Sequence, residues 1–254
     1  MLKALNTGAS AVSAQQAALD IIGNNVANVN TPGFKESRPD FADLVYRQVR
    51  ADQPAGQAPV VGQGVRLAGS QTVFYQGRLL ETGRQLDLAI AGEGFFQLTM
   101  PNGEKAFTRD GVLQVDAGGR LAASGGQVLD PEVRIPAGAE ISITEDGRVL
   151  VKDSQNSGFN QVGQISLTTF TNPAALSKIG DSLYQSNQNS GEPATGIPGS
   201  ADFGTLRSGF LEGANVDLAN ALTALIGVQR AYQFNTKVIS NADQMLGIAN
   251  DLRR

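Results

Sequence analysis

Hydrophobic residues recur at alternating steps of three and four at both ends of the chain, the spacing that places side chains on one face of an α-helix. The pattern predicts a first helix that ends near residues 28–30, because Pro32 disfavours helical backbone at Thr31 and Gly33 follows. Its apolar face comprises Leu2, Leu5, Ala9, Val12, Leu19, Ile22 and Val26, in a seven-residue register that only Gln16 and Gly23 interrupt.

The C-terminal pattern predicts a second and longer helix. Asn215 is a candidate cap for it, Asp217 falls in its first turn, and Arg253 and Arg254 fall in its last turn, so the charges suit the helix dipole. Helices of roughly 40 and 55 Å exceed what one compact domain needs, so we expect them to protrude. The apolar row of this helix comprises Ala221, Leu225, Val228, Tyr232, Asn235, Ile239, Ala242, Leu246 and Ala249.

Between the two helices the chain has the pattern of short strands and glycine-containing turns. Residues 34–46 fit a short helical or extended piece, and residues 50–69 fit an extended connector with Pro54 and Pro59. Alternating apolar residues from Leu86 onward begin a series of strands. Turns are predicted at 101–103, 116–119 and 145–147, each between two such strands, and residues 186–205 form a second connector. The middle is therefore expected to be mostly antiparallel sheet.

The composition removes many kinds of chemistry. The chain has no histidine, cysteine or tryptophan, so the common proton shuttle, thiolate nucleophiles and nearly all zinc sites are excluded. We expect no enzyme activity, no catalytic residues, no metal and no cofactor. Twenty basic and 24 acidic residues are scattered along the chain, which argues against a nucleic-acid partner.

The sequence also lacks signals for membrane insertion. There is no run of eighteen apolar residues and no apolar segment of the signal-peptide type near the start. A first helix lying on a membrane surface is a minor alternative, because Lys3 and Asp20 are its only charges and such helices carry a basic face.

Several local motifs admit two interpretations. Four asparagines, Asn24, Asn25, Asn28 and Asn30, crowd the end of the first helix, either simply to end it or because their amides bond neighbouring backbones or chains. Gly92-Glu93-Gly94 lacks the lysine of a nucleotide loop and fits a turn. On the last helix, Gln229, Arg230 and Tyr232 fit a solvated face with one aromatic in the apolar row.

Acidic side chains offer the one common enzyme chemistry that needs no histidine, the paired carboxylates of a glycoside hydrolase. The candidates lie in turn-like contexts, where Asp-Gly pairs are explained by turn formation. A hydrolase therefore remains a minor alternative of a different class. These candidates are Asp110, Asp116, Asp130, Glu145 and Asp146.

The two termini resemble the rod, hook and hook-associated family of bacterial flagellar axial proteins. The resemblance rests on residues 22–35 (IGNNVANVNTPGFK), 228–237 (VQRAYQFNTK) and 242–246 (ADQML). In the middle, residues 75–79 (YQGRL), 82–90 (TGRQLDLAI), 92–97 (GEGFFQ) and 108–111 (TRDG) look most like the distal rod members of the family. The similarity covers nearly the full chain, although the connector from Tyr46 to Arg66 is shorter than the insert of those members.

The resemblance implies an α+β protein in which the terminal helices pack as a coiled coil beside a central, mostly antiparallel β domain. The implied division is a helical assembly domain of residues 1–34 with 214–254, an extended connector 35–72, a β domain 73–185 and a return connector 186–213. The implied function is a subunit of the basal-body rod that polymerises into a helical shaft carrying torque from motor to hook. A proximal rod or hook-basal body relative is the alternative within the family. Outside the family, a stand-alone coiled-coil adhesin or scaffold is a further alternative, which predicts a closed oligomer of fixed size instead of open filaments.

The resemblance also implies partners and a location. The partners are further copies of the chain, other rod and hook subunits and the flagellar type III export apparatus, with no nucleic acid and no direct membrane insertion. The location is the extracytoplasmic basal body, reached without a cleaved signal peptide. The residues expected to form the assembly interface are Leu5, Val12, Leu19, Ile22, Asn24, Asn25, Val26, Asn28, Asn30, Phe34, Leu225, Val228, Gln229, Arg230, Tyr232, Asn235, Ile239, Asp243, Met245 and Leu246.

Overall fold

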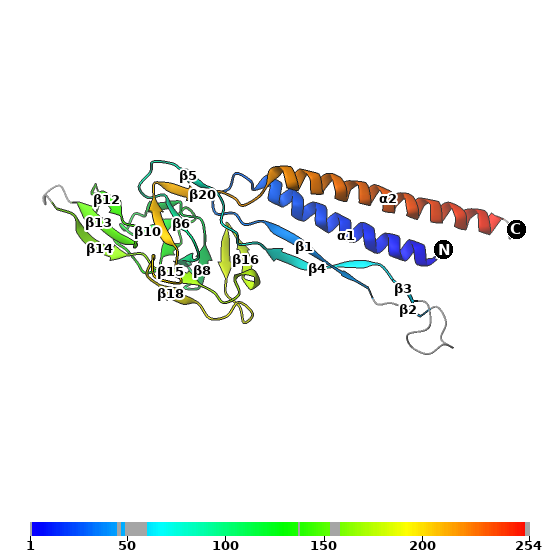
Figure 1. Cartoon of the computed structure of the whole chain (residues 1–254), viewed down its shortest axis with the longest axis horizontal. Coiled ribbons are helices and arrows are strands. Elements are labelled where there is room, and N and C mark those ends of the chain that lie inside the picture. Colours follow the sequence, from blue (N-terminus) through cyan, green and yellow to red (C-terminus); the bar gives the residue numbers. More distant parts are fainter. Residues whose placement is uncertain (1, 45–46, 49–59, 137, 153–157, 252–254) are drawn as a thin grey trace. The chain divides into compact units, whose positions relative to one another are not determined.

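The computed structural model describes residues 2–44, 47–48, 60–136, 138–152 and 158–251 (Figure 1). The chain forms two compact units. The first, which we call the helical unit, holds Met1–Ala27, Ser37–Gln71 and Asp217–Arg254, and the second, the β unit, holds Asn28–Glu36 and Thr72–Val216. Within the described ranges, no helix combines the length and apolar character needed to cross a membrane. The α+β class expected from the sequence is confirmed.

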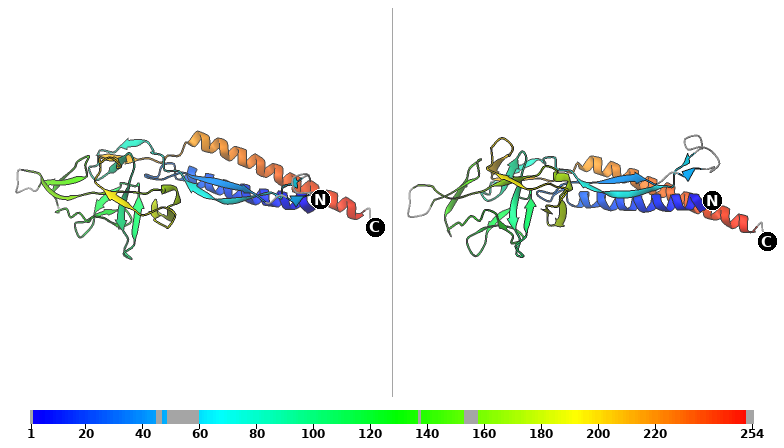
Figure 2. Two further views of the ribbon diagram at one scale, coloured as in Figure 1. Left: turned by 60° about the horizontal axis from the view of Figure 1, so that its bottom comes forward. Right: turned by 90° about the horizontal axis from the view of Figure 1, so that it is seen from below.

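The helical unit contains the two predicted helices, α1 (Leu2–Ala27) and α2 (Leu218–Asp251). They lie side by side and run in opposite directions, so that the first residues of α1 and the last residues of α2 are at the same end of this unit (Figure 2). The prediction that α1 ends before Thr31 is confirmed: the helix stops at Ala27, and the Thr31 amide donates to the Asn28 carbonyl oxygen at 3.0 Å.

The start of α2 differs from the sequence prediction. Asp217, not Asn215, caps the helix, because its Oδ1 accepts from the amides of Ala219 at 2.9 Å and Asn220 at 3.2 Å. These are the free amides that a capping side chain must reach. Asn215 is used elsewhere, in the β unit, and Arg253 and Arg254 lie outside the described residues.

A two-stranded arm completes the helical unit. Strand β1 (Ser37–Asp43) pairs with β4 (Val65–Thr72), and β2 (Arg47–Gln48) pairs antiparallel with β3 (Val60–Val61). Of the two possibilities for residues 34–46, the extended one is therefore observed over the described part, which ends at residue 44. The predicted connector 50–69 includes β3 and the start of β4, and its residues 49–59, with both prolines, lie outside the described residues.

The β unit is built around one large sheet with the strand order β16-β17-β8-β7-β11-β10-β9, to which β15 and β18 attach. A separate three-stranded sheet has the order β12-β13-β14, and two pairs, β19-β6 and β20-β5, complete the unit. The strands are β5 (Leu79–Glu81), β6 (Leu88–Ala91), β7 (Phe95–Thr99), β8 (Lys105–Thr108), β9 (Leu113–Val115), β10 (Leu121–Ala123), β11 (Val128–Leu129), β12 (Glu140–Ile143), β13 (Arg148–Lys152), β14 (Asn160–Gln164), β15 (Leu167–Thr169), β16 (Ser177–Gly180), β17 (Leu183–Gln185), β18 (Ala194–Gly196), β19 (Thr205–Ser208) and β20 (Phe210–Glu212).

All three predicted turns connect antiparallel strands. They join β7 to β8, β9 to β10 and β12 to β13, and Gly103, Gly119 and Gly147 take the positive φ angles of 84°, 77° and 81° that favour glycine. The region 186–213, expected as a connector, also contributes strands β18, β19 and β20. Residues 28–34, grouped with the first helix on sequence grounds, make their contacts in the β unit.

Two groups of buried side chains form the core of the β unit. The larger one is aliphatic and includes Leu88, Ile90 and Leu98 from β6 and β7. The smaller one is aromatic: Phe95 makes edge contacts with Phe170 and Tyr184, whose ring centroids lie 5.8 and 6.2 Å away. Such edge contacts add to the gain from burial.

Candidate assembly surfaces and a buried ion cluster

The face by which α1 packs in its own chain is made of small residues. Gly8, Ala14 and Ala18 are buried on it, followed by Ile22 and Asn25. A Cβ atom built on Gly8 would lie 2.8 Å from Cγ1 of Ile239 in α2. Small side chains thus let the two helix backbones approach closely.

This face coincides only in part with the one the apolar pattern suggested: Ile22 belongs to both, and most of the other predicted residues lie one position further along α1. There, Ala9 is exposed, and Leu5, Val12, Leu19 and Val26 are half-buried. These larger aliphatic residues lie beside the buried face, where the close approach of α2 at Gly8 leaves no space for a side chain. Part of their apolar surface therefore remains open in the single chain.

The predicted row on α2 is the face turned inward. Ala221 and Ala242 are buried on it, and Leu225, Val228, Tyr232, Asn235, Ile239 and Leu246 are half-buried. Ala249, near the end of the helix, is exposed. The other interface candidates on α2, Gln229, Arg230, Asp243 and Met245, are exposed.

A second apolar row lies on the outside of α2. We call Phe234, Val238, Met245 and Ile248 the outer row; steps of four, seven and three residues separate them, which keeps them in one heptad register. Their side chains are 71%, 47%, 52% and 62% exposed, respectively. Nothing in the described part of the helical unit covers them, although large apolar side chains are usually placed away from water.

One of the four asparagines closes a loop within the helical unit. Asn25 is 2% exposed, and its amide pairs with the backbone of Ser37, donating to the carbonyl oxygen at 2.8 Å and accepting from the amide at 3.0 Å. The interpretation that these amides bond neighbouring backbones is confirmed here. Asn28 accepts a bond from the Thr31 hydroxyl at 3.2 Å, and Asn24 and Asn30 are exposed.

A cluster of buried charges centres on Glu212 in the β unit. Its Oε1 accepts from Lys35 Nζ at 2.6 Å and from the Gly77 amide at 2.8 Å, and its Oε2 accepts from Arg109 Nη1 at 3.3 Å. The side chains of Lys35 and Glu212 are 0% exposed and that of Arg109 is 5% exposed. Lys35 Nζ also donates to the Tyr75 carbonyl oxygen at 2.8 Å.

Two buried cations share one carboxylate in this cluster, so desolvation dominates its electrostatics. Burial lowers the pKa of the Lys35 ammonium and of the Arg109 guanidinium, and the charge of Glu212 opposes both shifts. The guanidinium of Arg109 also lies over the Phe95 ring, 5.3 Å from its centroid, while its Nε has no hydrogen-bond partner. Burial likewise raises the pKa of the neighbouring Tyr184 hydroxyl.

Close backbone contacts surround the cluster. The Gly33 amide donates to the Glu212 carbonyl oxygen at 2.7 Å, and a side chain on Gly33 would collide with the backbone of Arg109 and Asp110. Gly77 is equally constrained by the Gly213 carbonyl. Asn215 accepts from the Glu36 amide at 2.8 Å and donates to the carbonyl oxygens of Val73 and Tyr75 at 2.8 and 3.1 Å.

The sequence pattern did not predict the ion cluster, although two of its residues lie in motifs that carry the family resemblance. Phe34 was expected at the assembly interface, but it is 8% exposed within the β unit, where the Lys178 ammonium lies 5.1 Å from its ring centroid. Lys35 and Arg109 were noted only as letters of a motif, and Glu212 was not noted. The available signal was the position of these two basic residues in a chain with few charges: Lys35 lies two residues after Gly33, and Arg109 lies two residues before Gly111.

Three of the five acidic residues weighed as a hydrolase site, Asp110, Asp116 and Asp146, serve their own turns. Asp116 accepts from the Gly118 and Arg120 amides at 2.8 Å each and pairs with Arg120, Asp146 pairs with Arg148 at 2.6 Å, and Asp110 accepts from the Val112 amide at 3.0 Å. Among the described residues, no three acidic, histidine or cysteine side chains group as metal ligands do. Gly92 and Gly94 have φ angles of 115° and 130° in the bend between β6 and β7, which fits the turn interpretation.

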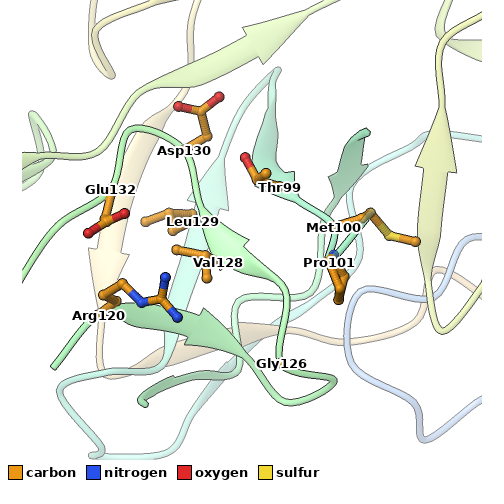
Figure 3. Close-up of a pocket in the computed structure, with 9 residues that line it drawn as sticks. All are labelled: Thr99, Met100, Pro101, Arg120, Gly126, Val128, Leu129, Asp130 and Glu132. Atoms are coloured by element: carbon orange, nitrogen blue, oxygen red, sulfur yellow. The ribbon is translucent and has the colours of Figure 1, made fainter. Parts of the chain in front are cut away.

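One shallow pocket lies in the β unit beside β11 (Figure 3). Arg120 and Glu132 line one side of it and Met100 and Pro101 the other. Its charged side chains already have partners in the chain, since Arg120 pairs with Asp116, Glu132 with Arg134, and Asp130 with Lys105. The pocket therefore offers little unsatisfied polarity to a ligand.

Comparison with known proteins decides the family. Residues 5–35 match the family model described as flagella basal body rod protein, residues 89–151 match the flagellar hook protein FlgE/F/G D1 domain, and residues 207–252 match the flagellar basal body rod FlgEFG protein C-terminal model. The chain is 41% identical to the flagellar basal-body rod protein FlgG of Borreliella burgdorferi over 264 aligned residues, covering 100% of both chains. The chain belongs to the flagellar basal-body rod protein family.

Other relatives show how the similarity divides within the family. The FlgG protein of Bacillus subtilis is 38% identical and also covers 100% of both chains. The flagellar hook-basal body complex protein FlhP of the same organism is 28% identical over 100% of both chains. The greater similarity to FlgG agrees with the resemblance to distal rod members.

Proposed function

We propose that this protein is a structural subunit of the flagellar basal-body rod and that it builds a helical shaft by binding further copies of itself through α1 and α2. The family membership supports the first part. The outer row of α2 supports the second, because four large apolar side chains in heptad register are exposed in the single chain.

Helix burial between copies supplies the free energy for this assembly. Covering apolar surface contributes about 25 cal/mol per Å². Two unlike surfaces are available: the outer row of α2 and the half-buried aliphatic residues of α1, such as Val12 and Leu19. A contact between unlike surfaces is heterologous, and where the rotation does not close a ring it extends into a helical filament.

The remaining roles follow from the same proposal. The interface residues named from the sequence that stay exposed or half-buried on the two helices contact neighbouring copies, whereas Ile22 and Asn25 are buried within the chain and support the helices from inside. Other rod and hook subunits are the neighbours at the ends of the shaft. The export apparatus delivers the chain to the extracytoplasmic basal body, and the shaft transmits torque. The protein acts by assembly and not by catalysis.

A hook-basal body role is the alternative within the family, and the 28% identity to FlhP is the observation that keeps it open. A strain lacking the chain's own gene separates the two. If the chain is a rod subunit, basal bodies isolated from that strain end below the distal rod, whereas a hook-basal body role leaves the rod complete.

Electron microscopy of the purified protein tests self-assembly. The wild type is expected to form open filaments, and Phe234→Asp or Ile248→Asp in the outer row is expected to prevent them, because a carboxylate would have to be buried without a partner. Gln233→Asp places the same charge on an exposed polar position of the same helix and should still assemble. Filaments from the outer-row variants would refute the assignment of this surface, and closed rings of fixed size would favour a scaffold.

A further inference from the structure

The chain passes between its two units at only four places, after residues 27, 36, 71 and 216. Every covalent connection between the helices and the β unit therefore runs through one of these crossings. On the β-unit side, the segments next to these crossings are residues 28–36, 72–77 and 212–216. The buried ion cluster and Asn215 lie on these segments, with Arg109 added from the turn after β8.

Glu212 ties together segments that are far apart in the sequence. Its side chain accepts from Lys35, which is 177 residues away, from Gly77, which is 135 residues away, and from Arg109, which is 103 residues away. Its backbone carbonyl accepts from Gly33. One glutamate thus holds the segment that follows α1 and the segment that follows β4, while its own segment leads into α2.

Asn215 repeats the pattern nearer to the crossings. It bonds the backbones of Glu36 and Val73, and Val73 in turn donates its amide to the Glu36 carbonyl oxygen at 2.9 Å. These three residues lie within two residues of the crossings after 36, 71 and 216. The three backbone segments that contain Glu36, Val73 and Asn215 are therefore bonded directly to one another where they leave the β unit.

We propose that Glu212, Lys35, Arg109 and Asn215 form a junction clamp, which holds the crossing segments as one block, so that they cannot slide along or separate from one another. Buried ion pairs contribute little net stability compared with apolar packing, but they demand particular partners in a particular geometry. A clamp that fixes the position of one segment along another needs this demand for particular partners. Lys35 lies in the first 36 residues of the 254-residue chain, Glu212 and Asn215 lie in the last 43, and Arg109 comes from the middle. The clamp therefore closes only when both end regions are in place.

The use of such a clamp in a shaft rests on the proposed function. If the helices are held by neighbouring copies, every covalent path for load between them and the β unit passes through these four crossings. A clamp spreads that load over several segments, whereas a single unclamped strand would carry it alone.

Amide hydrogen exchange of the full-length monomer, followed by mass spectrometry, tests the clamp without requiring assembly. Glu212→Gln weakens all three side-chain interactions, and Lys35→Met keeps the apolar stem of the lysine while it removes the ammonium. In both variants, peptides covering residues 31–37, 72–78 and 211–217 are expected to exchange about tenfold faster or more, while the β7–β8 hairpin stays as protected as in the wild type. Asp116→Asn breaks an exposed ion pair in the same unit and serves as the matched control, which should leave these three peptides unchanged.

Three outcomes would overturn the proposal. The first is unchanged exchange in the three peptides of both variants. The second is faster exchange in one of the three peptides alone, because a clamp must release its segments together. The third is equal loss of protection throughout the β unit in both variants, because the cluster would then support the core and not the junction. A failure of the protein to polymerise would count against the proposed function and leave these results standing.

Discussion

Gly8 of α1 and Ile239 of α2 fit against each other with no space for a side chain on the glycine, since an added Cβ would lie 2.8 Å from Ile239 Cγ1. Alanine at a helix interior is favoured over glycine by about 1 kcal/mol. Overpacking of a tight contact costs about 1–3 kcal/mol. We therefore expect Gly8→Ala to lower the thermal midpoint of the helical signal in circular dichroism, despite its better helix propensity.

Gly23, in the same helix, is the matched control, because an added Cβ there would meet nothing within 4 Å. Gly23→Ala is expected to raise the free energy of unfolding by about 0.5–1 kcal/mol. If both substitutions were to stabilise the protein equally, α1 and α2 would not pack closely at Gly8.

The Asn25–Ser37 pairing gives a second prediction. Asn25→Ala removes two hydrogen bonds at a site that is 2% exposed. The loss of each bond at a buried site costs about 1–3 kcal/mol, so we expect chemical denaturation to show a free energy of unfolding lower by about 2–4 kcal/mol. Asn30→Ala, at an exposed position, should change it by less than about 0.5 kcal/mol. Equal effects of the two substitutions would mean that the asparagines only end the helix.

The sequence predicts local structure well in this chain because the signals are local. Heptad spacing defines both helices, and the glycines at 103, 119 and 147 mark turns that the structure contains. Two features could not be predicted. The buried face of α1 depends on how closely the backbones approach, and at Gly8 the neighbouring Ile239 leaves no space for a side chain.

The ion cluster was hidden for a different reason. Glu212 and Lys35 are 177 residues apart, and no spacing rule connects them. Asn215 shows the same limit, since its position before a helix suggested a cap, while its amide is satisfied by Glu36, Val73 and Tyr75. Polar residues that bond distant backbone segments leave no periodic pattern in a sequence.

Asp110 gives a prediction about pH. Burial and the charge of Asp87 raise the pKa of its carboxyl above the usual 3.8, although the Val112 amide opposes the shift. The folded protein then binds this proton more tightly than the unfolded chain, so stability falls as the pH rises from 3.8 through the raised pKa. Asp110→Asn keeps an oxygen for the Val112 amide and carries no charge. We expect it to melt at a higher temperature than the wild type at pH 7, with the difference disappearing toward pH 3.

The matched control for this experiment is Asp116→Asn. The pKa of the Asp116 carboxyl is lowered, chiefly by bonds from Arg120, so its substitution should give the opposite sign of effect at pH 7. A gain from Asp110→Asn that persists unchanged at pH 3 would show that the charge of Asp110 is not its cause.

The two rows of α2 predict different behaviour of the monomer. Leu225 belongs to the row of α2 that faces inward and packs within its own chain, which we call the inner row. Phe234 belongs to the outer row and is 71% exposed. Short-lived opening exposes helices to proteases, and the proposed assembly leaves part of the helical packing to neighbouring copies. Limited proteolysis of the monomer should therefore trim roughly the first thirty and last forty residues before it cuts the β unit. Leu225→Asp should accelerate this trimming and Phe234→Asp should leave its rate unchanged, although both should prevent filaments. Equal trimming rates for the two variants, or equal resistance of all parts of the wild type, would contradict the division of α2 into an inner row for its own chain and an outer row for its neighbours.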